Sequence, residues 1–235
     1  MSGRESRLRA RLRDGRLVGT FVKLAALESI EICASELDFA VIDLEHSQLA
    51  EGDVLRLVRH ADALGFAAVV RIPEVDRGLV NRLLEAGAAG IQLSSVRRRA
   101  EVDALVSAML YAPDGARSLS LAQPRAGFGS APLRDYLARQ ERPLVVVQLE
   151  TATTDDSPEE ILANGVDVAF IGTTDLTVDL QLDEERVAAR VEELVTAAER
   201  TGVFLGGFGF EHERLRYEVR SADVALLRKA VAGVR

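Results

Sequence analysis

Cysteine is nearly absent from this sequence, because Cys33 is the only one in 235 residues. A single thiol excludes a disulfide framework within the chain and lacks the ligand spacing of a zinc site. No apolar run approaches the roughly 18 residues that a membrane-spanning helix requires. The N-terminal segment also lacks the apolar core of a signal peptide. We therefore expect a cytoplasmic protein with no membrane association.

Lysine is almost as rare, because only Lys23 and Lys229 occur among 29 basic residues. Aldolases and decarboxylases that form a Schiff base need a buried lysine with a lowered pKa. Lys229 falls in a predicted amphipathic C-terminal helix, which leaves Lys23 as the sole candidate. The composition therefore disfavours imine catalysis.

Positive charge is also in deficit, since the net charge is −8 and no long block of like charge occurs. This balance argues against a nucleic-acid partner. Hydrophobic residues make up 48% and charged residues 28% of the chain, as in globular proteins. No shift in composition marks a linker, and the length suits one α/β barrel. We expect residues 1–235 to form a single domain.

Short apolar runs alternate with segments of helical periodicity along the chain. In the segment 183–202, apolar residues recur on one helical stripe. Eight strand candidates alternating with helices predict a (β/α)₈ barrel. Only EHERL (211–215) separates the last two strands, so the seventh helix should be almost absent. The strand candidates are 17–24, 38–45, 67–73, 90–96, 144–150, 168–175, 203–210 and 216–219.

Polar residues follow several of these strands, at the end where barrel enzymes carry their active sites. Asp43, Glu45 and His46 follow the second strand, and Arg71 ends the third. The fifth and sixth strands end in Gln148, Glu150, Gly172, Thr173, Thr174 and Asp175. The barrel should bring these side chains together on one rim.

The residue types on this rim suit the chemistry of an enolate. Glu150 and Asp175 come from adjacent strands, and two carboxylates suit Mg²⁺ or Mn²⁺ better than zinc. Arg71 offers a guanidinium fork to a substrate carboxylate. His46 is a general acid/base candidate because its ordinary pKa lies near neutrality. Together these groups predict a metal-chelated 2-oxo acid that forms an enolate at C3.

Structural roles are the alternative for each residue taken singly. The DLEH segment (43–46) could be a solvated strand end, and Arg71 could be a structural ion-pair partner. His60 is expected on a helix surface and His212 in a loop. The co-occurrence of polar residues at four strand ends is what favours a site.

Six motifs occur in the order GTFVKL, DFAVIDLEHS, VVRIP, LLEAGAAGI, VVVQLET and FIGTTDL. In this order and spacing, over about residues 4 to 180, they resemble the HpcH/HpaI aldolase/citrate lyase family. That family includes metal-dependent pyruvate aldolases of the phosphoenolpyruvate/pyruvate barrel superfamily. The resemblance implies that Glu150 and Asp175 bind the metal, with Co²⁺ also acceptable. It implies that Arg71 binds the substrate.

Further roles rest on the resemblance alone. His46 would be the acid/base, held by Asp43, and Gln148 would support the metal-bound substrate. Arg125, in the long segment after the fourth helix, would contribute to the site. Backbone amides would hold the substrate carboxylate at Gly172, Thr173 and Thr174.

Several residues depart from the family pattern. Glu85 stands where the family usually has an aspartate that pairs with the histidine. Ser94 replaces a usual proline, Thr173 stands in a segment where GP is common, and Ser118 replaces a glycine. These positions lie in or near the expected site, so the substrate class could differ from that of other members.

The sequence predicts an aldolase that cleaves or forms a carbon–carbon bond at C3 of a pyruvate-like 2-oxo acid, with an aldehyde or acid as acceptor. Two alternatives remain: a citrate-synthase-like enzyme that condenses oxaloacetate, and a barrel that binds metal and keto acid without turnover. Superfamily members commonly exchange their eighth helix between subunits. Because Val224, Leu227, Val231 and Val234 form a stripe, we expect a dimer-based homo-oligomer, potentially a hexamer.

Overall fold

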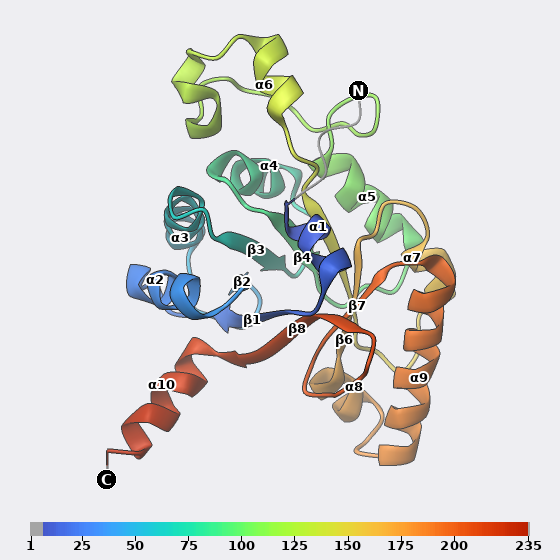
Figure 1. The fold of residues 1–235 in the computed structure, drawn as a ribbon. Coiled ribbons are helices and arrows are strands. Elements are labelled where there is room, and N and C mark those ends of the chain that lie inside the picture. Colours follow the sequence, from blue (N-terminus) through green and yellow to red (C-terminus); the bar gives the residue numbers. More distant parts are fainter. Residues whose placement is uncertain (1–6, 235) are drawn as a thin grey trace.

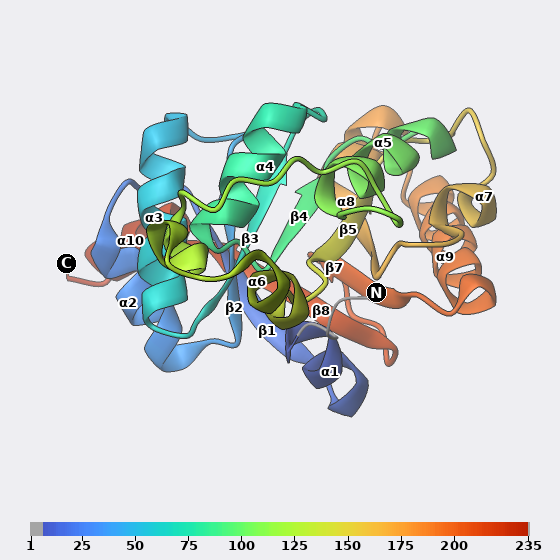
Figure 2. The ribbon, with the colours of Figure 1, turned by 90° about the horizontal axis from the view of Figure 1, so that it is seen from above.

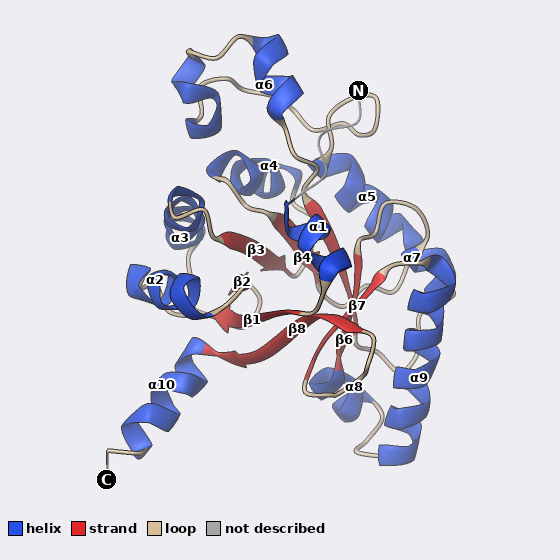
Figure 3. Ribbon diagram, in the orientation of Figure 1, coloured by secondary structure: helices blue, strands red, loops and turns tan. Residues whose placement is uncertain are grey.

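Eight parallel strands form one closed barrel in this computed structural model, which describes residues 7–234 (Figure 1 and Figure 3). Each strand pairs with the next along the chain, and β8 pairs with β1 to close the sheet. The predicted barrel is therefore confirmed. The strands are β1 Leu17–Val22, β2 Phe39–Asp43, β3 Ala67–Ile72, β4 Gly90–Leu93, β5 Leu144–Leu149, β6 Val168–Gly172, β7 Phe204–Phe208 and β8 Leu215–Ala222.

Helices surround the barrel and connect most of its strands (Figure 2). They are α1 Arg7–Asp14, α2 Leu27–Glu36, α3 Glu51–Ala63, α4 Arg77–Ala86, α5 Arg99–Met109, α6 Leu133–Arg139, α7 Pro158–Leu162, α8 Thr173–Asp179, α9 Glu184–Thr201 and α10 Asp223–Ala232, with a 3-10 helix η1 at Pro124–Gly129. None of these helices combines the length and hydropathy needed to cross a lipid bilayer.

The core has two layers, one inside the barrel and one between strands and helices. Inside, Phe39 stacks on Tyr217 with ring centroids 4.2 Å apart. Leu8 and Leu12 of α1 belong to this inner layer. Arg9 of α1 also pairs with Asp167, just before β6. Helix α1 therefore closes the N-terminal end of the barrel, and the opposite end stays open.

Local sequence signals set the ends and buried faces of the helices. Gly87 and Gly202 terminate α4 and α9 at φ of 116° and 71°, a conformation that glycine adopts without steric cost. Helix α9 buries Leu194 and Val195 from the predicted stripe. The 3.6-residue periodicity therefore identified the face of α9 that packs on the barrel.

The connection between β7 and β8 contains no helix, as predicted from its length. Residues 209–214, all of which the structure describes, lie between the two parallel strands. Parallel neighbours usually need a connection of about a dozen residues or more. Here the five residues of β7 span roughly 16 Å, and six extended residues reach roughly 20 Å. An extended return path is therefore just long enough.

Two segments extend away from the ring of barrel helices (Figure 1). One is residues 110–143, which carry η1 and α6 between α5 and β5. The other is α10, which leaves the barrel after β8. Four apolar residues of α10 are exposed: Val224, Leu226, Leu227 and Val231. Val224, Leu227 and Val231 share one face of α10, so this face is apolar and is left uncovered by residues 7–234.

Replacing Gly90 with alanine should destabilise the barrel. An added Cβ would lie 2.7 Å from the Cβ of Leu144 on the neighbouring strand, so the two strands would have to separate. We expect a loss of roughly 1–3 kcal/mol in the free energy of unfolding, measured by urea denaturation. Gly52→Ala is the matched control, because open space surrounds Gly52 in α3. Alanine there should increase the free energy of unfolding, by about 1 kcal/mol at most. Equal stability of both variants would contradict close packing at Gly90.

Candidate active site

A cavity of about 240 Å³ lies at the open, C-terminal end of the barrel. Phe21, Phe170 and Phe208 supply apolar walls. Seven residues predicted from the sequence also line it: His46, Arg71, Gln148, Gly172, Thr173, Thr174 and Asp175. The fold therefore brings residues from four strand ends into one cavity.

The polar residues form the uppermost layer of the barrel interior. Side chains alternate between the two faces of a strand, so the residue two positions beyond an interior residue also points inward. Interior apolar residues occupy the layers below, at Phe21, Val41, Val69, Val146 and Phe170. Two positions further along each strand stand Lys23, Asp43, Arg71, Gln148 and Gly172. Strand periodicity thus places the change from apolar to polar at the mouth of the barrel.

A bidentate ion pair joins Asp43 and Arg71, which are register partners on β2 and β3. Arg71 Nε donates to Asp43 Oδ1 at 2.9 Å, and Nη2 donates to Oδ2 at 2.6 Å. Both side chains are almost fully buried. Burial alone would raise the pKa of Asp43, but the hydrogen bonds and charge of Arg71 lower it to about 2. Asp43 therefore remains a carboxylate throughout the physiological range.

The same carboxylate holds the turn that follows β2. The backbone N–H groups of Glu45 and His46 donate to Asp43 Oδ1 at 3.0 and 3.2 Å. Lys23 Nζ lies 3.1 Å from Asp43 Oδ2 and 3.1 Å from the carbonyl oxygen of His46. The imidazole is half exposed, with Nε2 3.8 Å from Glu45 Oε2. Asp43 thus contacts the backbone of His46, and Glu45 faces the ring.

Arg71 retains donors that can reach a substrate. Its guanidinium lies 4.5 Å from the ring centroid of Phe21, and Nη1 pairs with Glu45 at 3.3 Å. Of five N–H groups, Asp43 takes two and Glu45 one, which leaves at least two at the tip. Arg71 is therefore a structural ion-pair partner whose tip also borders the cavity.

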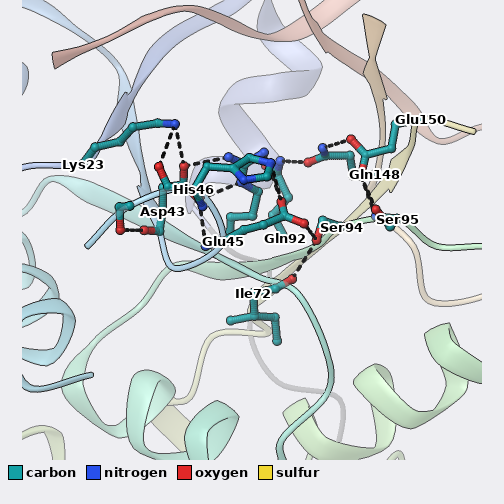
Figure 4. A network of polar contacts seen from close by, with 12 residues as sticks. Lys23, Asp43, Glu45, His46, Ile72, Gln92, Ser94, Ser95, Gln148 and Glu150 are labelled. Atoms are coloured by element: carbon teal, nitrogen blue, oxygen red, sulfur yellow. Dashed lines mark hydrogen bonds and ion pairs between the residues drawn. The ribbon is translucent and has the colours of Figure 1, made fainter. Parts of the chain in front are cut away.

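Glu150 is buried at the end of β5 and accepts hydrogen bonds on both oxygens. Ser95 donates to Oε1 from its N–H at 2.8 Å and its hydroxyl at 2.6 Å. Gln148 Nε2 donates to Oε2 (Figure 4). Burial raises the pKa of Glu150; the hydrogen bonds from Ser95 and Gln148 oppose the rise, and the negative charge of Asp175 adds to it. The Glu150 carboxylate therefore lacks the positive partner that Asp43 has.

Two backbone positions, Gly172 and Ser95, allow the Glu150 carboxylate to adopt its place and its hydrogen bonds. A Cβ on Gly172 would lie 2.6 Å from Glu150 Oε2, so β6 requires glycine there. Ser95 has a φ of +51°, in the left-handed region that residues other than glycine seldom adopt. In this conformation its amide and hydroxyl both reach the same carboxylate oxygen. Backbone strain of this kind persists where surrounding contacts impose it.

The donor set suits a hard divalent cation. Glu150 is buried after β5. Asp175 is exposed in the first turn of α8, which directly follows the neighbouring strand β6. Within residues 7–234, no cluster of three or more histidine, cysteine, aspartate or glutamate side chains is placed to hold a metal. A cation held here would therefore have two carboxylate ligands and would need oxygen ligands from water or substrate. It would also offset the buried negative charge of Glu150.

Two residues assigned from the resemblance lie elsewhere. Glu85 is near the C-terminal end of α4, where Asn81 Nδ2 donates to its Oε1 at 3.3 Å. Arg125 lines a different cavity, together with Ala67 and Ala89 beside the N-terminal ends of β3 and β4. Within one chain, the structure therefore brings neither residue to the cavity that contains His46.

Two residues of the site were not assigned a role from the sequence. Lys23 was considered only for imine chemistry, yet it lines the cavity and contacts Asp43. Its position directly after β1 was a usable signal, because the other site residues also follow strands. Ser95 also follows a strand, and the sequence marks it only as a weaker polar strand end, because its contact with Glu150 depends on a backbone angle.

The comparisons with known proteins agree with this geometry. Residues 17–225 match the model of the HpcH/HpaI aldolase/citrate lyase family. The chain is 31% identical to the hydroxypyruvate/pyruvate aldolase of Rhizorhabdus wittichii, over 93% of this chain and 92% of that protein. A family protein from Burkholderia cenocepacia superposes with a TM-score of 0.87 and 29% identity over 97% of both chains.

The citrate synthase SbnG superposes with a TM-score of 0.83 over 97% of this chain and 95% of its own, at 24% identity, which is a likeness of fold alone. The family match spans most of the chain and includes every strand of the barrel. This protein is therefore a member of the HpcH/HpaI aldolase/citrate lyase family.

Proposed function

We propose that this protein is a divalent-metal-dependent aldolase that makes or breaks a carbon–carbon bond at C3 of a pyruvate-like 2-oxo acid. The observation that carries the proposal is one cavity lined by His46, Arg71 and Asp175, with the buried carboxylate of Glu150 hydrogen-bonded to Gln148 in its wall. The relative named hydroxypyruvate/pyruvate aldolase supports the same substrate class. The co-substrate would be an aldehyde or an acid.

Glu150 and Asp175 would hold Mg²⁺ or Mn²⁺, with Co²⁺ as a further candidate. When bound, the cation supplies positive charge that stabilises negative charge developing on the substrate. Ser95 and Gln148 orient Glu150 through the hydrogen bonds described above. Gln148 is in turn fixed by Gln92, whose Nε2 donates to Gln148 Oε1 at 2.6 Å.

The remaining residues would bind the keto acid and move its proton. The free N–H groups of Arg71 would bind the substrate, and the backbone amides of Gly172, Thr173 and Thr174 would hold its carboxylate. The half-exposed imidazole of His46 can exchange a proton with the hydroxyl of an aldol. Asp43 and Lys23 would keep that imidazole in place, because they hold the turn on which it stands.

The condensing reaction with oxaloacetate is the alternative that uses the same enolate in the opposite direction. The fold likeness to SbnG is compatible with it but carries no residue-level argument. A binding protein without turnover is the second alternative. Exchange of the C3 protons of pyruvate with deuterium separates enolising enzymes from binders, because only an enolising site incorporates the label.

Removing either metal ligand should abolish both cation binding and enolisation. We expect Glu150→Ala and Asp175→Ala to lose Mn²⁺ binding in an electron paramagnetic resonance titration. Both should also lose metal-dependent deuterium exchange into pyruvate, followed by NMR. Because the pKa of Glu150 is raised above its ordinary 4.5, protons should begin to displace the metal at a higher pH than at an exposed glutamate.

Glu192→Ala is the matched control, since this exposed glutamate of α9 lies outside the cavity. It should bind Mn²⁺ as the unsubstituted protein does. Normal Mn²⁺ affinity in Glu150→Ala, or full exchange after removal of divalent metal, would falsify the metal assignment.

Substitutions of His46 and Arg71 should separate proton transfer from substrate binding. His46→Ala should lower aldol cleavage by roughly 10²–10⁴-fold while metal and pyruvate affinity are retained. Arg71→Lys should weaken pyruvate binding and exchange together, because a lysine keeps the charge beside Asp43 but loses the planar fork. Steady-state kinetics and pyruvate titrations measure both effects.

Glu85→Asp is the informative companion variant, because the family usually has aspartate at this position. Higher activity would indicate that the longer side chain weakens a pairing with histidine, and lower activity would indicate a site rebuilt around glutamate. Wild-type cleavage in His46→Ala would leave the DLEH turn with a structural role only.

The protein should be a homo-oligomer built from dimers, with a hexamer as the largest form expected. Helix α10 would exchange between neighbouring subunits and bury its apolar face there. Glu85 and Arg125 lie away from the active-site cavity of their own chain. In an oligomer they would be able to reach the active site of an adjacent subunit. The oligomeric mass is the direct observable.

Light scattering at micromolar concentration should report an oligomer, and Leu227→Asp should dissociate it by placing a charge on the apolar face of α10. Lys229→Asp, which places the same acid on the opposite face of the helix, is the control and should preserve the assembly. A monomeric mass for the unsubstituted chain would rule out this arrangement.

A further inference from the structure

A second cavity, of about 310 Å³, lies at the end of the barrel opposite the candidate active site. It is bordered by the N-terminal ends of β3, β4 and β5, by α1, and by the segment 110–143. Arginines dominate its charge: Arg7, Arg117, Arg125 and Arg142 line it. Of these four arginines, the proposed aldolase function uses only Arg125, in the site of an adjacent copy, and it uses neither Arg117 nor Arg142.

Arg117 is nine-tenths buried at this cavity, with one end of its guanidinium unsatisfied. Its Nε donates to Asn81 Oδ1 at 3.1 Å, and its plane lies 4.7 Å from the ring centroid of Tyr111. Nη2 is buried and has no hydrogen-bond partner. Burial lowers the pKa of Arg117, and the positive charge of Arg125 lowers it further. A buried N–H group without a hydrogen-bond partner is costly, so an anion that accepts from Arg117 Nη2 would stabilise it.

Arg142 also lines this cavity and carries a second unsatisfied donor. Its Nη2 donates to the carbonyl oxygen of Gly165 at 3.1 Å, whereas its Nε is buried without a partner. The two unsatisfied N–H groups therefore come from opposite ends of the segment 110–143, one soon after α5 and one just before β5. A ligand that accepts hydrogen bonds from both would bridge them.

The carboxylates around the cavity do not neutralise these arginines. Glu141 pairs with Arg7, whose Nε lies 3.4 Å from Glu141 Oε1. Glu85 reaches Arg117 only through Asn81, and Asp62 lines the wall without an ion pair. Across residues 7–234, Arg117, Arg125 and Arg142 form no ion pair with a carboxylate. An excess of positive charge at one cavity is notable in a chain whose net charge is −8.

We propose that this cavity binds a small anion bearing a phosphate group or two carboxylates, held by Arg117 and Arg142. The planar guanidinium matches the oxygens of both groups and binds them with charge-assisted hydrogen bonds. The volume is in the range of sites for small metabolites. The proposal stands independently of the aldolase function, because that function assigns no role to Arg117 or Arg142.

The test is calorimetric titration of the full-length protein, free of divalent metal, with inorganic phosphate and separately with malonate. Chloride at matched ionic strength is the reference. The unsubstituted protein should bind at least one of the two probes saturably, and the tighter probe identifies the ligand class. Arg142→Gln and Arg117→Lys should each weaken binding by roughly tenfold or more, the loss expected for one charge-assisted hydrogen bond.

Arg186→Gln removes an equal charge from the exposed surface of α9, outside the cavity, and should bind like the unsubstituted protein. Circular dichroism checks that Arg117→Lys is folded, and Arg142→Gln gives an independent reading if it is not. Arg71→Lys should also retain full binding, because Arg71 lies at the other end of the barrel.

Three results would overturn the proposal. The first is the absence of saturable binding of either probe. The second is wild-type affinity in Arg142→Gln together with weakened binding in Arg71→Lys, which would place the anion in the aldolase cavity. The third is a change in oligomeric mass caused by the two arginine variants without any anion binding, which would make this face a contact between copies of the chain.

Discussion

The carboxylate of Asp43 is the group on which the geometry of the site depends. It accepts hydrogen bonds from Arg71, from the backbone of Glu45 and His46, and pairs with Lys23. These partners stand at the ends of β1, β2 and β3, so one side chain fixes three strand ends relative to each other. Asp43 has no exposed surface and need not touch a substrate. Its effect is to set where the tip of Arg71 and the ring of His46 lie.

Glu150 is the electrostatic counterpart of Asp43 at the opposite end of the polar network (Figure 4). Both carboxylates are buried, but Asp43 is compensated by two cations whereas Glu150 accepts only neutral hydrogen bonds. Their pKa values are therefore shifted in opposite directions, to about 2 for Asp43 and upward for Glu150. One carboxylate organises a cationic wall, and the other retains unsatisfied negative charge that a metal ion can neutralise. Under the proposed function, this asymmetry would separate the metal side of the cavity from the cationic side that Arg71 and Lys23 form.

Sequence periodicity was sufficient to predict the barrel and the rim, because β2, β3 and β5 each carry a polar residue at the position where the interior opens. It could not predict that Arg71 is clamped by Asp43, since that contact follows from the register between β2 and β3. Nor could it predict the positive φ of Ser95, which depends on tertiary contacts. Glu85 and Arg125 were assigned by motif position, which identifies a residue but not the end of the barrel at which it lies.

The short return from β7 to β8 changes how the barrel closes. Residues 173–203 separate β6 from β7, whereas residues 209–214 separate β7 from β8, a connection about five times shorter. A shorter connection loses less chain entropy when its ends are brought together, which favours the pairing of β8 with β7. The last two strands are thus the most local parallel pair in the sheet. The sheet is closed by its least local pairing, that of β8 with β1, whose partners lie about 200 residues apart.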